Sequence, residues 1–223
     1  MKILIINPNS DPGMTESILN AARDFVNGEY TVDCLPTPGA PAFIETYEDQ
    51  VEAAPGMIRL LRDNEEKYDA FIDACHCDPN LDVLKEITEK PVVGIGEASM
   101  KIASMLGHRF SVISTSHRSI PNKEALIRKY HLQDMAASVR APGKEAESFD
   151  DEEKYLLAAQ AAINDDRAEV IVLGCAGMAG LDKRLQERLS VPVLDGVICA
   201  LIIASGLVTY NVSTSKIRRY KPE

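Results

Sequence analysis

The sequence predicts an α/β protein of two pseudosymmetric lobes, each a mostly parallel sheet flanked by helices, with the active site in the cleft between the lobes. Three observations support this prediction. Apolar runs of strand length alternate with amphipathic stretches of helical length, a pattern typical of parallel sheets covered on both faces. Two segments, which end at Ser104 and Ser205, read as degenerate copies of each other. Polar residues and cysteines gather directly after several predicted strands.

The two copies share their landmarks. Their cysteines, Cys75 and Cys175, are 100 residues apart, as are the leucines that stand six positions later. Their prolines, Pro91 and Pro192, are 101 residues apart, so a single insertion aligns the copies, and an Ile-Ala-Ser stands eleven residues beyond each proline. Two like lobes facing each other would place one thiol on each side of a shared cleft. Such an arrangement suits removal of a proton from one face of a carbon and its return to the other face.

The first predicted strand, Lys2 to Asn7 (KILIIN), is an apolar run that ends at the turn residues Pro-Asn-Ser-Asp-Pro. A helix is expected from Thr15 to Val26, because its apolar residues fall near one face. Tyr30 to Leu35 alternates in the manner of a strand. The segment Pro36 to Pro41 (PTPGAP) is expected to be a rigid loop, because proline restricts the backbone.

An amphipathic helix is expected from Thr46 to Arg62, followed by a buried strand from Tyr68 to Ala74. A short helical stretch follows the leucine of each copy, and the apolar run from Val197 to Val208 predicts a buried helix. The remaining predicted strands are Pro91 to Ile95, Phe110 to Ser114, Ala136 to Arg140, Glu169 to Gly174 and Pro192 to Leu194.

The repeat predicts how the chain divides into lobes. We expect a first lobe over residues 1–96, which the C-terminal segment 206–223 can complete, and a second lobe over residues 97–205. The tail from Tyr210 to Glu223 is polar and basic, and it is expected to lie on the surface or at an interface.

The net charge, the apolar runs and the cysteine content indicate which binding partners and which cell compartment to expect. The chain has 223 residues and a formal net charge of −10, so its surface should repel nucleic acid and anionic membranes. We expect no export signal, because the apolar start runs into a polar turn within seven residues, and no apolar run reaches membrane-spanning length. Five cysteines are then most simply cytosolic thiols. These features predict a cytoplasmic protein without a nucleic-acid or membrane partner.

The candidate site residues follow the strands, because ligands collect at the carboxyl ends of parallel strands. Each thiol, Cys75 or Cys175, would lie between a strand end and a helix N-terminus, where the helix dipole favours the thiolate. Cys34 and Cys199 are expected to be buried structural residues. The expected substrate-binding groups are the side chains of Asn9, Ser114 and Thr115 and the backbone of Ala176 and Gly177.

Five segments resemble the aspartate/glutamate/hydantoin racemase superfamily, and the hydantoin and allantoin racemases in particular. They are INPNS (6–10), GAPAFIETYED (39–49), DACHCDPNLD (73–82), PVVGIGEAS (91–99) and VIVLGCAGM (170–178). The resemblance covers nearly the whole chain in the family's order. It implies two pseudosymmetric α/β lobes, a cofactor-independent reaction, a homo-oligomer, and Cys75 and Cys175 as opposed acid and base.

One motif departs from the family pattern. Hydantoin-type racemases usually carry Cys-Phe-Gly-Asp-Pro-Gly around the first cysteine, whereas Cys75 is followed here by His76, Cys77, Asp78, Pro79 and Asn80. The change affects the substrate pocket more than the proton chemistry. It leaves open that Cys77 is the working thiol of the first lobe. It also leaves open a metal site made of Cys75, His76 and Cys77.

The residues and the resemblance together predict a racemase or epimerase that acts on an acidic C–H next to a carbonyl. A hydantoin-type substrate is expected, and no metal, pyridoxal phosphate or nicotinamide is required. The alternatives within the superfamily are an aspartate- or glutamate-type racemase, a decarboxylase and a cis–trans isomerase. Outside enzymes, the alternatives are a small-molecule binding protein and a redox sensor that uses Cys75 and Cys77.

Overall fold

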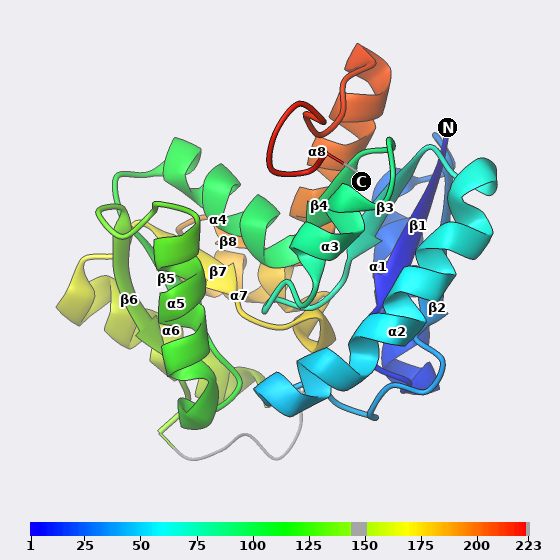
Figure 1. Cartoon of the computed structure of the whole chain (residues 1–223). Coiled ribbons are helices and arrows are strands. Elements are labelled where there is room, and N and C mark those ends of the chain that lie inside the picture. Colours follow the sequence, from blue (N-terminus) through cyan, green and yellow to red (C-terminus); the bar gives the residue numbers. More distant parts are fainter. Residues whose placement is uncertain (144–150, 222–223) are drawn as a thin grey trace. The chain divides into compact units, whose positions relative to one another are not determined.

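The computed structural model describes residues 1–143 and 151–221 (Figure 1). The chain divides into two compact units, one of Met1–Ile95 with the segment that begins at Ala200, the other of Gly96–Cys199. The described strands form two four-stranded sheets, ordered β2-β1-β3-β4 and β6-β5-β7-β8, and all their pairings are parallel. The predicted fold class of two α/β lobes is confirmed.

The first sheet and its helices occupy the first part of the chain. In order they are β1 (Lys2–Asn7), α1 (Pro12–Val26), β2 (Thr31–Pro36), α2 (Tyr47–Asn64), η1 (Glu65–Lys67), β3 (Ala70–Asp73), α3 (Leu81–Glu86) and β4 (Val92–Gly94). The second part continues with α4 (Ile95–Leu106), β5 (Phe110–Ile113), η2 (His117–Ser119), α5 (Ile120–Lys129), β6 (Ala136–Arg140), α6 (Glu152–Asp166), β7 (Val170–Leu173), η3 (Ala176–Met178), α7 (Leu181–Leu189), β8 (Val193–Leu194) and α8 (Gly196–Tyr210).

The sequence repeat is a repeat of topology. Each sheet has the same strand order when its strands are counted from its own start. The backbone N–H of Phe71 donates to the carbonyl of Pro91 at 2.9 Å, and the equivalent Ile171 N–H donates to Pro192 at 2.9 Å. The two thiol-bearing segments therefore follow the same strand, the third, in both units.

Local signals explain the helix starts. Helix α1 begins three residues before the predicted Thr15, because Asp11 caps it by accepting the Met14 N–H at 2.7 Å and proline suits its first turn. Helix α2 begins with a capping box, in which Thr46 accepts the Asp49 N–H at 3.1 Å and the Asp49 carboxylate accepts the Thr46 N–H at 2.7 Å.

Alternating strand residues separate the two faces of each sheet. In the second unit, Ile171 and Leu173 pack with α6 and α7, whereas Val170 and Val172 pack with α4 and α5. In the first unit, α2 and α3 pack on the face that carries Leu4, and α1 lies on the opposite face (Figure 1). Both sheets are thus buried on both sides, as their nearly continuous apolar strands predict.

The last helix is less buried than expected, whereas the described part of the tail lies on the surface of its unit, as expected. Helix α8 is buried along one side only, and Ile202 on its other side is 49% exposed. The tail returns to α3 of the first unit, where the Lys216 ammonium donates to the carbonyls of Lys85 and Glu86 at 2.5 and 3.0 Å. The Tyr220 hydroxyl donates to Asp82 at 2.7 Å. A basic group at a helix C-terminus is favourable, so the tail stabilises the helix that follows the Cys75 turn.

Candidate active site

Buried polar side chains concentrate at the carboxyl ends of the strands in both units. An unpaired polar group in a protein interior is costly, so such a concentration marks either a hydrogen-bonded loop structure or a site. The group consists of Asn7 and Asn9 at and after the end of β1, Thr37 after β2, Asp73, His76 and Asp78 at and after the end of β3, Ser114 after β5 and Asp195 after β8.

The Cys75 turn begins directly beyond β3. Cys75 is half-buried and packs against the apolar core of its own unit. The turn closes where the Asp78 N–H donates to the Cys75 carbonyl at 2.8 Å, and Asp78 and Asn80 both adopt the left-handed backbone conformation. His76 inside this turn is 1% exposed, so the residue that replaces the family's aromatic side chain is buried.

The Cys175 turn has the same construction beyond β7. Cys175 is half-buried and packs against the core of the second unit, and the Met178 N–H donates to its carbonyl at 3.1 Å. The Gly177 N–H donates to the Cys175 sulfur at 3.4 Å. A backbone donor aimed at the sulfur stabilises the thiolate over the thiol.

The position before Cys175 has no room for a side chain. A Cβ added at Gly174 would lie 2.6 Å from the Ile113 carbonyl oxygen, and the Gly174 N–H donates to that oxygen at 2.8 Å. Only glycine allows this contact, so the end of β7 is held against β5. The thiol is presented from a rigid strand end.

Comparison with known proteins identifies the family. The Asp/Glu/Hydantoin racemase family model matches residues 3–204. The chain belongs to this family. A hydantoin racemase from Pseudomonas sp. (strain NS671) is 37% identical over 227 residues, covering 99% of this chain and 91% of that protein.

Two solved structures are similar to this racemase over its full length. The allantoin racemase from Klebsiella pneumoniae is 32% identical with a TM-score of 0.94, and the match covers 100% of this chain and 94% of the other. The allantoin racemase from Pseudomonas fluorescens is 35% identical, also with a TM-score of 0.94, and the match covers 100% and 97% of the two chains. The protein is therefore an isomerase of the racemase class.

Asn9, the candidate in the first loop of the racemase, is 5% exposed and lies in a hydrogen-bonded turn. Its side-chain oxygen, Oδ1, accepts hydrogen bonds from the Asn7 side-chain amide at 2.7 Å and from the Asp11 backbone N–H at 3.0 Å. Its amide nitrogen donates to the Met14 sulfur at 3.1 Å, and sulfur is a weak acceptor. The amide nitrogen is thus the part of Asn9 with donor capacity for a ligand, while Asn7 holds its orientation.

Ser114 and Thr115 follow β5 in the second unit. Ser114 is fully buried, its N–H donates to the Arg140 carbonyl at 2.7 Å, and its hydroxyl is hydrogen-bonded to Ser119. Thr115 is half-buried. The Ser114 hydroxyl is thus used inside the loop, where it fixes the backbone that presents Thr115.

Ala176 and Gly177 make the short helical turn after Cys175. Ala176 is buried and Gly177 is half-buried. The Gly177 N–H was expected to be a donor to the substrate, and in the structure it is the donor to the Cys175 sulfur.

The other two assigned thiols are confirmed as buried. Cys34 is 7% exposed and Cys199 is 2% exposed. Burial raises the pKa of each thiol to about 12, so both remain protonated at neutral pH. Their burial distinguishes them from Cys75, Cys77 and Cys175, which are half-buried.

Sequence reasoning missed two ionisable groups at the strand ends, Asp73 as the buried last residue of β3 and Asp195. Asp195 directly follows β8 and is 5% exposed. The pKa of Asp195 is raised to about 6, chiefly by burial and next by the negative charge of Asp182. The rule that selected Asn9 and Cys175, a polar residue at the carboxyl end of a parallel strand, would also have selected Asp195.

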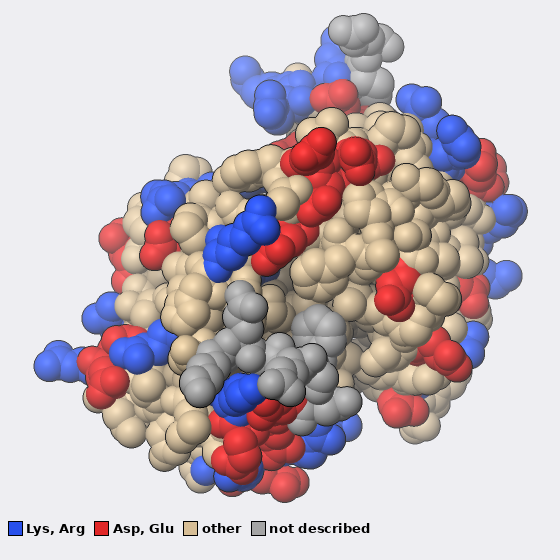
Figure 2. Space-filling model, turned by 90° about the horizontal axis from the view of Figure 1, so that it is seen from below, with Lys and Arg blue, Asp and Glu red and all other residues tan. Residues whose placement is uncertain are grey.

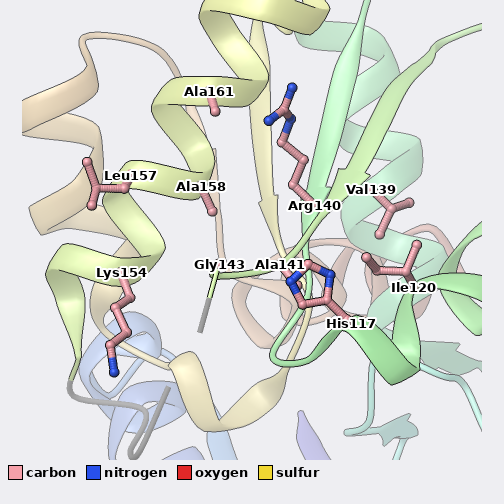
Figure 3. A pocket seen from close by; sticks show the side chains of 10 residues that line it. All are labelled: His117, Ile120, Val139, Arg140, Ala141, Gly143, Lys154, Leu157, Ala158 and Ala161. Atoms are coloured by element: carbon pink, nitrogen blue, oxygen red, sulfur yellow. The ribbon is translucent and has the colours of Figure 1, made fainter. Parts of the chain in front are cut away.

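A pocket of about 690 Å³ lies in the second unit beside the end of the edge strand β6 (Figure 3). Helix α6 forms one side with Lys154, Leu157, Ala158 and Ala161. Arg140 is paired with Asp166 at 2.5 Å, and this pair lowers the pKa of the Asp166 carboxyl. The ten described lining residues include the basic side chains of His117, Arg140 and Lys154 but no thiol, so neither proposed catalytic cysteine lines this pocket.

Three further findings concern other classes of site. Within residues 1–143 and 151–221, no three His, Cys, Asp or Glu side chains are grouped as metal ligands, and this includes Cys75, His76 and Cys77. No helix of the described chain is both long and apolar enough to cross a membrane. On the face shown in Figure 2, most basic side chains stand beside acidic ones.

Proposed function

We propose that this racemase interconverts the enantiomers of a hydantoin-type substrate, a 5-substituted hydantoin or allantoin, and that Cys75 and Cys175 transfer the protons. One observation carries the proposal. The two half-buried thiols occupy equivalent turns after the third strand of two units with the same strand order. The names of the similar proteins supply the substrate class.

The mechanism needs two proton carriers of opposite protonation state. One cysteine, as thiolate, removes the proton from the carbon next to the carbonyl, and the electron pair moves into a planar enolate. The other cysteine, as thiol, donates its proton to the opposite face of that carbon. The two residues exchange roles for the other enantiomer, so neither direction needs a separate base.

Hydrogen-bond donors stabilise the enolate oxygen as negative charge develops on it. The candidates are the Asn9 amide, the Thr115 hydroxyl with the loop that Ser114 fixes, and the Ala176 backbone N–H. We assign the Gly177 N–H to the Cys175 thiolate instead, because it already points at the sulfur.

The acidity of the substrate favours a hydantoin over a free amino acid. The carbon acid of a hydantoin is flanked by ring amide groups that delocalise the carbanion. A cysteine thiolate is then a sufficient base, without a metal or a pyridine ring as electron sink. We therefore propose that the reaction proceeds without a cofactor.

The test uses Cys75→Ser and Cys175→Ser, assayed by circular-dichroism decay over a panel of hydantoins, allantoin, aspartate and glutamate. Each variant should lose interconversion, because a serine hydroxyl is a far poorer base than a thiolate, and removing a positioned base costs about 10²- to 10⁴-fold in rate. In D₂O each variant should still exchange the α-proton of one enantiomer. The two variants should select opposite enantiomers.

Two results would change the assignment. If Cys75→Ser keeps near-normal racemisation while Cys77→Ser loses it, the base of the first unit is Cys77. If both Cys75→Ser and Cys175→Ser racemise normally, the two-thiol mechanism is wrong. Formation of a disulfide between Cys75 and Cys77 under mild oxidant, with no turnover of any substrate in the panel, would instead indicate a redox sensor.

A further inference from the structure

At two aligned positions near the thiol turn, each copy of the repeat carries one buried aspartate, but not at the same position. With the prolines aligned, Gly94 at the end of β4 is equivalent to Asp195 at the end of β8. With the cysteines aligned, Asp78 is equivalent to Met178. Each unit therefore has one aspartate in this pair of positions, at the turn in the first unit and at the strand end in the second.

In the second unit the carboxylate of Asp195 joins two segments. Its Oδ1 accepts the Val197 N–H at 2.7 Å and the Ile198 N–H at 3.4 Å, both in the first turn of α8. It also accepts a backbone hydrogen bond from Gly180. Gly180 ends the turn that begins at Cys175, and its φ of 83° is left-handed. The carboxylate thus ties the thiol turn to the corner between β8 and α8.

In the first unit, the carboxylate of Asp78, which belongs to the thiol turn, lies against Gly94 at the end of β4. A Cβ added at Gly94 would lie 2.3 Å from Asp78 Oδ1 and 2.5 Å from its Cγ. The Asp78 carboxylate therefore fills the space in which a side chain at position 94 would begin. Asp78 is 3% exposed, and its own N–H closes the turn on the Cys75 carbonyl at 2.8 Å.

Resting on the function proposed above, we propose that Asp78 and Asp195 are the positioning residues of Cys75 and Cys175, each holding its thiol turn against the corner where the fourth strand ends. Carboxylate oxygens accept several N–H donors at once, and the hydrogen bonds are stronger because the acceptor is charged. A displacement of about 1 Å in a reacting group can cost about 10²-fold in rate. A buried carboxylate that holds each thiol turn against the end of the fourth strand prevents such a displacement.

The exchange of positions supplies a matched test in the first unit. Asp78→Gly removes the carboxylate, and glycine suits the φ of 47° at this position. Gly94→Asp alone introduces a Cβ that collides with the Asp78 carboxylate and also lies 2.7 Å from Leu81 Cδ2, so in the double variant only the end of the Leu81 side chain still has to shift. The double variant moves the carboxylate from the turn to the strand end, as in the second unit. Both single variants should be impaired, and the double variant should recover at least tenfold over the worse single variant.

The readout is α-proton exchange in D₂O, measured for each enantiomer. Asp78→Gly should slow exchange at least tenfold for the enantiomer that Cys175→Ser still exchanges, and should change the other less than twofold. Asp195→Ala should show the opposite selectivity. Equal effects on both enantiomers, or no effect on either, would overturn the positioning role, because a general loss of stability does not select a face of the substrate.

A second readout needs no substrate. Iodoacetamide labelling, followed residue by residue across pH, should show a changed rate at Cys75 in Asp78→Gly and at Cys175 in Asp195→Ala, with the other thiol unchanged. If a variant fails to fold, the isosteric Asp78→Asn and Asp195→Asn take its place in both measurements. Unchanged labelling would overturn the inference. Normal racemisation by both serine variants would overturn the proposed function alone, since the labelling test stands without it.

Discussion

The close approach of β7 and β5 makes Gly174→Ala a sharp test of how Cys175 is positioned. The new Cβ would lie 2.6 Å from the Ile113 carbonyl oxygen, whereas ordinary contact begins at 3.4 Å, so the strand end must move by about 0.8 Å. That carbonyl accepts the Gly174 N–H in the β5–β7 ladder and cannot turn aside without breaking this bond. The movement is passed to the next residue, Cys175.

We expect two separable effects. A shift of this size at a reacting group predicts a loss of about 10²-fold in kcat. Overpacking of the strand end predicts a decrease of about 1–3 kcal/mol in the free energy of unfolding. Circular-dichroism decay of an optically pure hydantoin measures the first, and urea unfolding followed by far-UV circular dichroism measures the second.

The matched control is Gly206→Ala in α8. A Cβ there meets nothing within 4 Å, so the same substitution should leave kcat unchanged and should not lower stability, because alanine favours a helix. Proton exchange in Gly174→Ala should fall mainly for the enantiomer that Cys75→Ser still exchanges. Normal kcat in folded Gly174→Ala would refute the argument that strand contact positions this thiol.

Three further predictions follow from the charge, the surface and the chemistry. Asp195 has a pKa raised from 3.8 to about 6, so the folded state holds this proton more tightly and loses stability as pH rises through that interval. The titratable groups that interact with Asp195 are Asp182 and Cys199. Between pH 4 and 7, the free energy of unfolding of Asp195→Asn, measured with urea, should rise by up to about 3 kcal/mol relative to that of the parent. A difference between the two proteins that stays constant with pH would contradict this. The protein should be a homo-oligomer, because Ile202, Tyr210 and Ile217 are exposed on α8 and the tail; light scattering that gives only the monomer mass at micromolar concentration would contradict this. Activity should survive EDTA but need a reductant that keeps the thiols reduced, whereas loss with EDTA and recovery with zinc would support the Cys75, His76 and Cys77 metal site.

The sequence by itself determined the fold class, the order of the strands along the chain and the two equivalent thiols. These features are local or periodic. An apolar run that ends in a turn predicts a strand, as at Lys2–Asn7, and self-similarity places Cys75 and Cys175 at the same point of two units without any knowledge of contacts. The start of α1 was predicted three residues too late, because periodicity does not show that Asp11 caps the helix, whereas the starts of α2 and α8 were predicted within one residue.

The tertiary structure alone decided which polar groups surround each thiol. Asp78 and Gly94 are sixteen residues apart, and their contact exists only because β3 and β4 pair in the folded unit. The Gly177 N–H on the Cys175 sulfur and the Ser114 hydroxyl on Ser119 are local contacts, but they depend on the exact turn geometry, which residue type does not give. Hydrogen bonding and burial are properties of the packed chain, and residue type alone does not reveal whether a donor is available to a ligand.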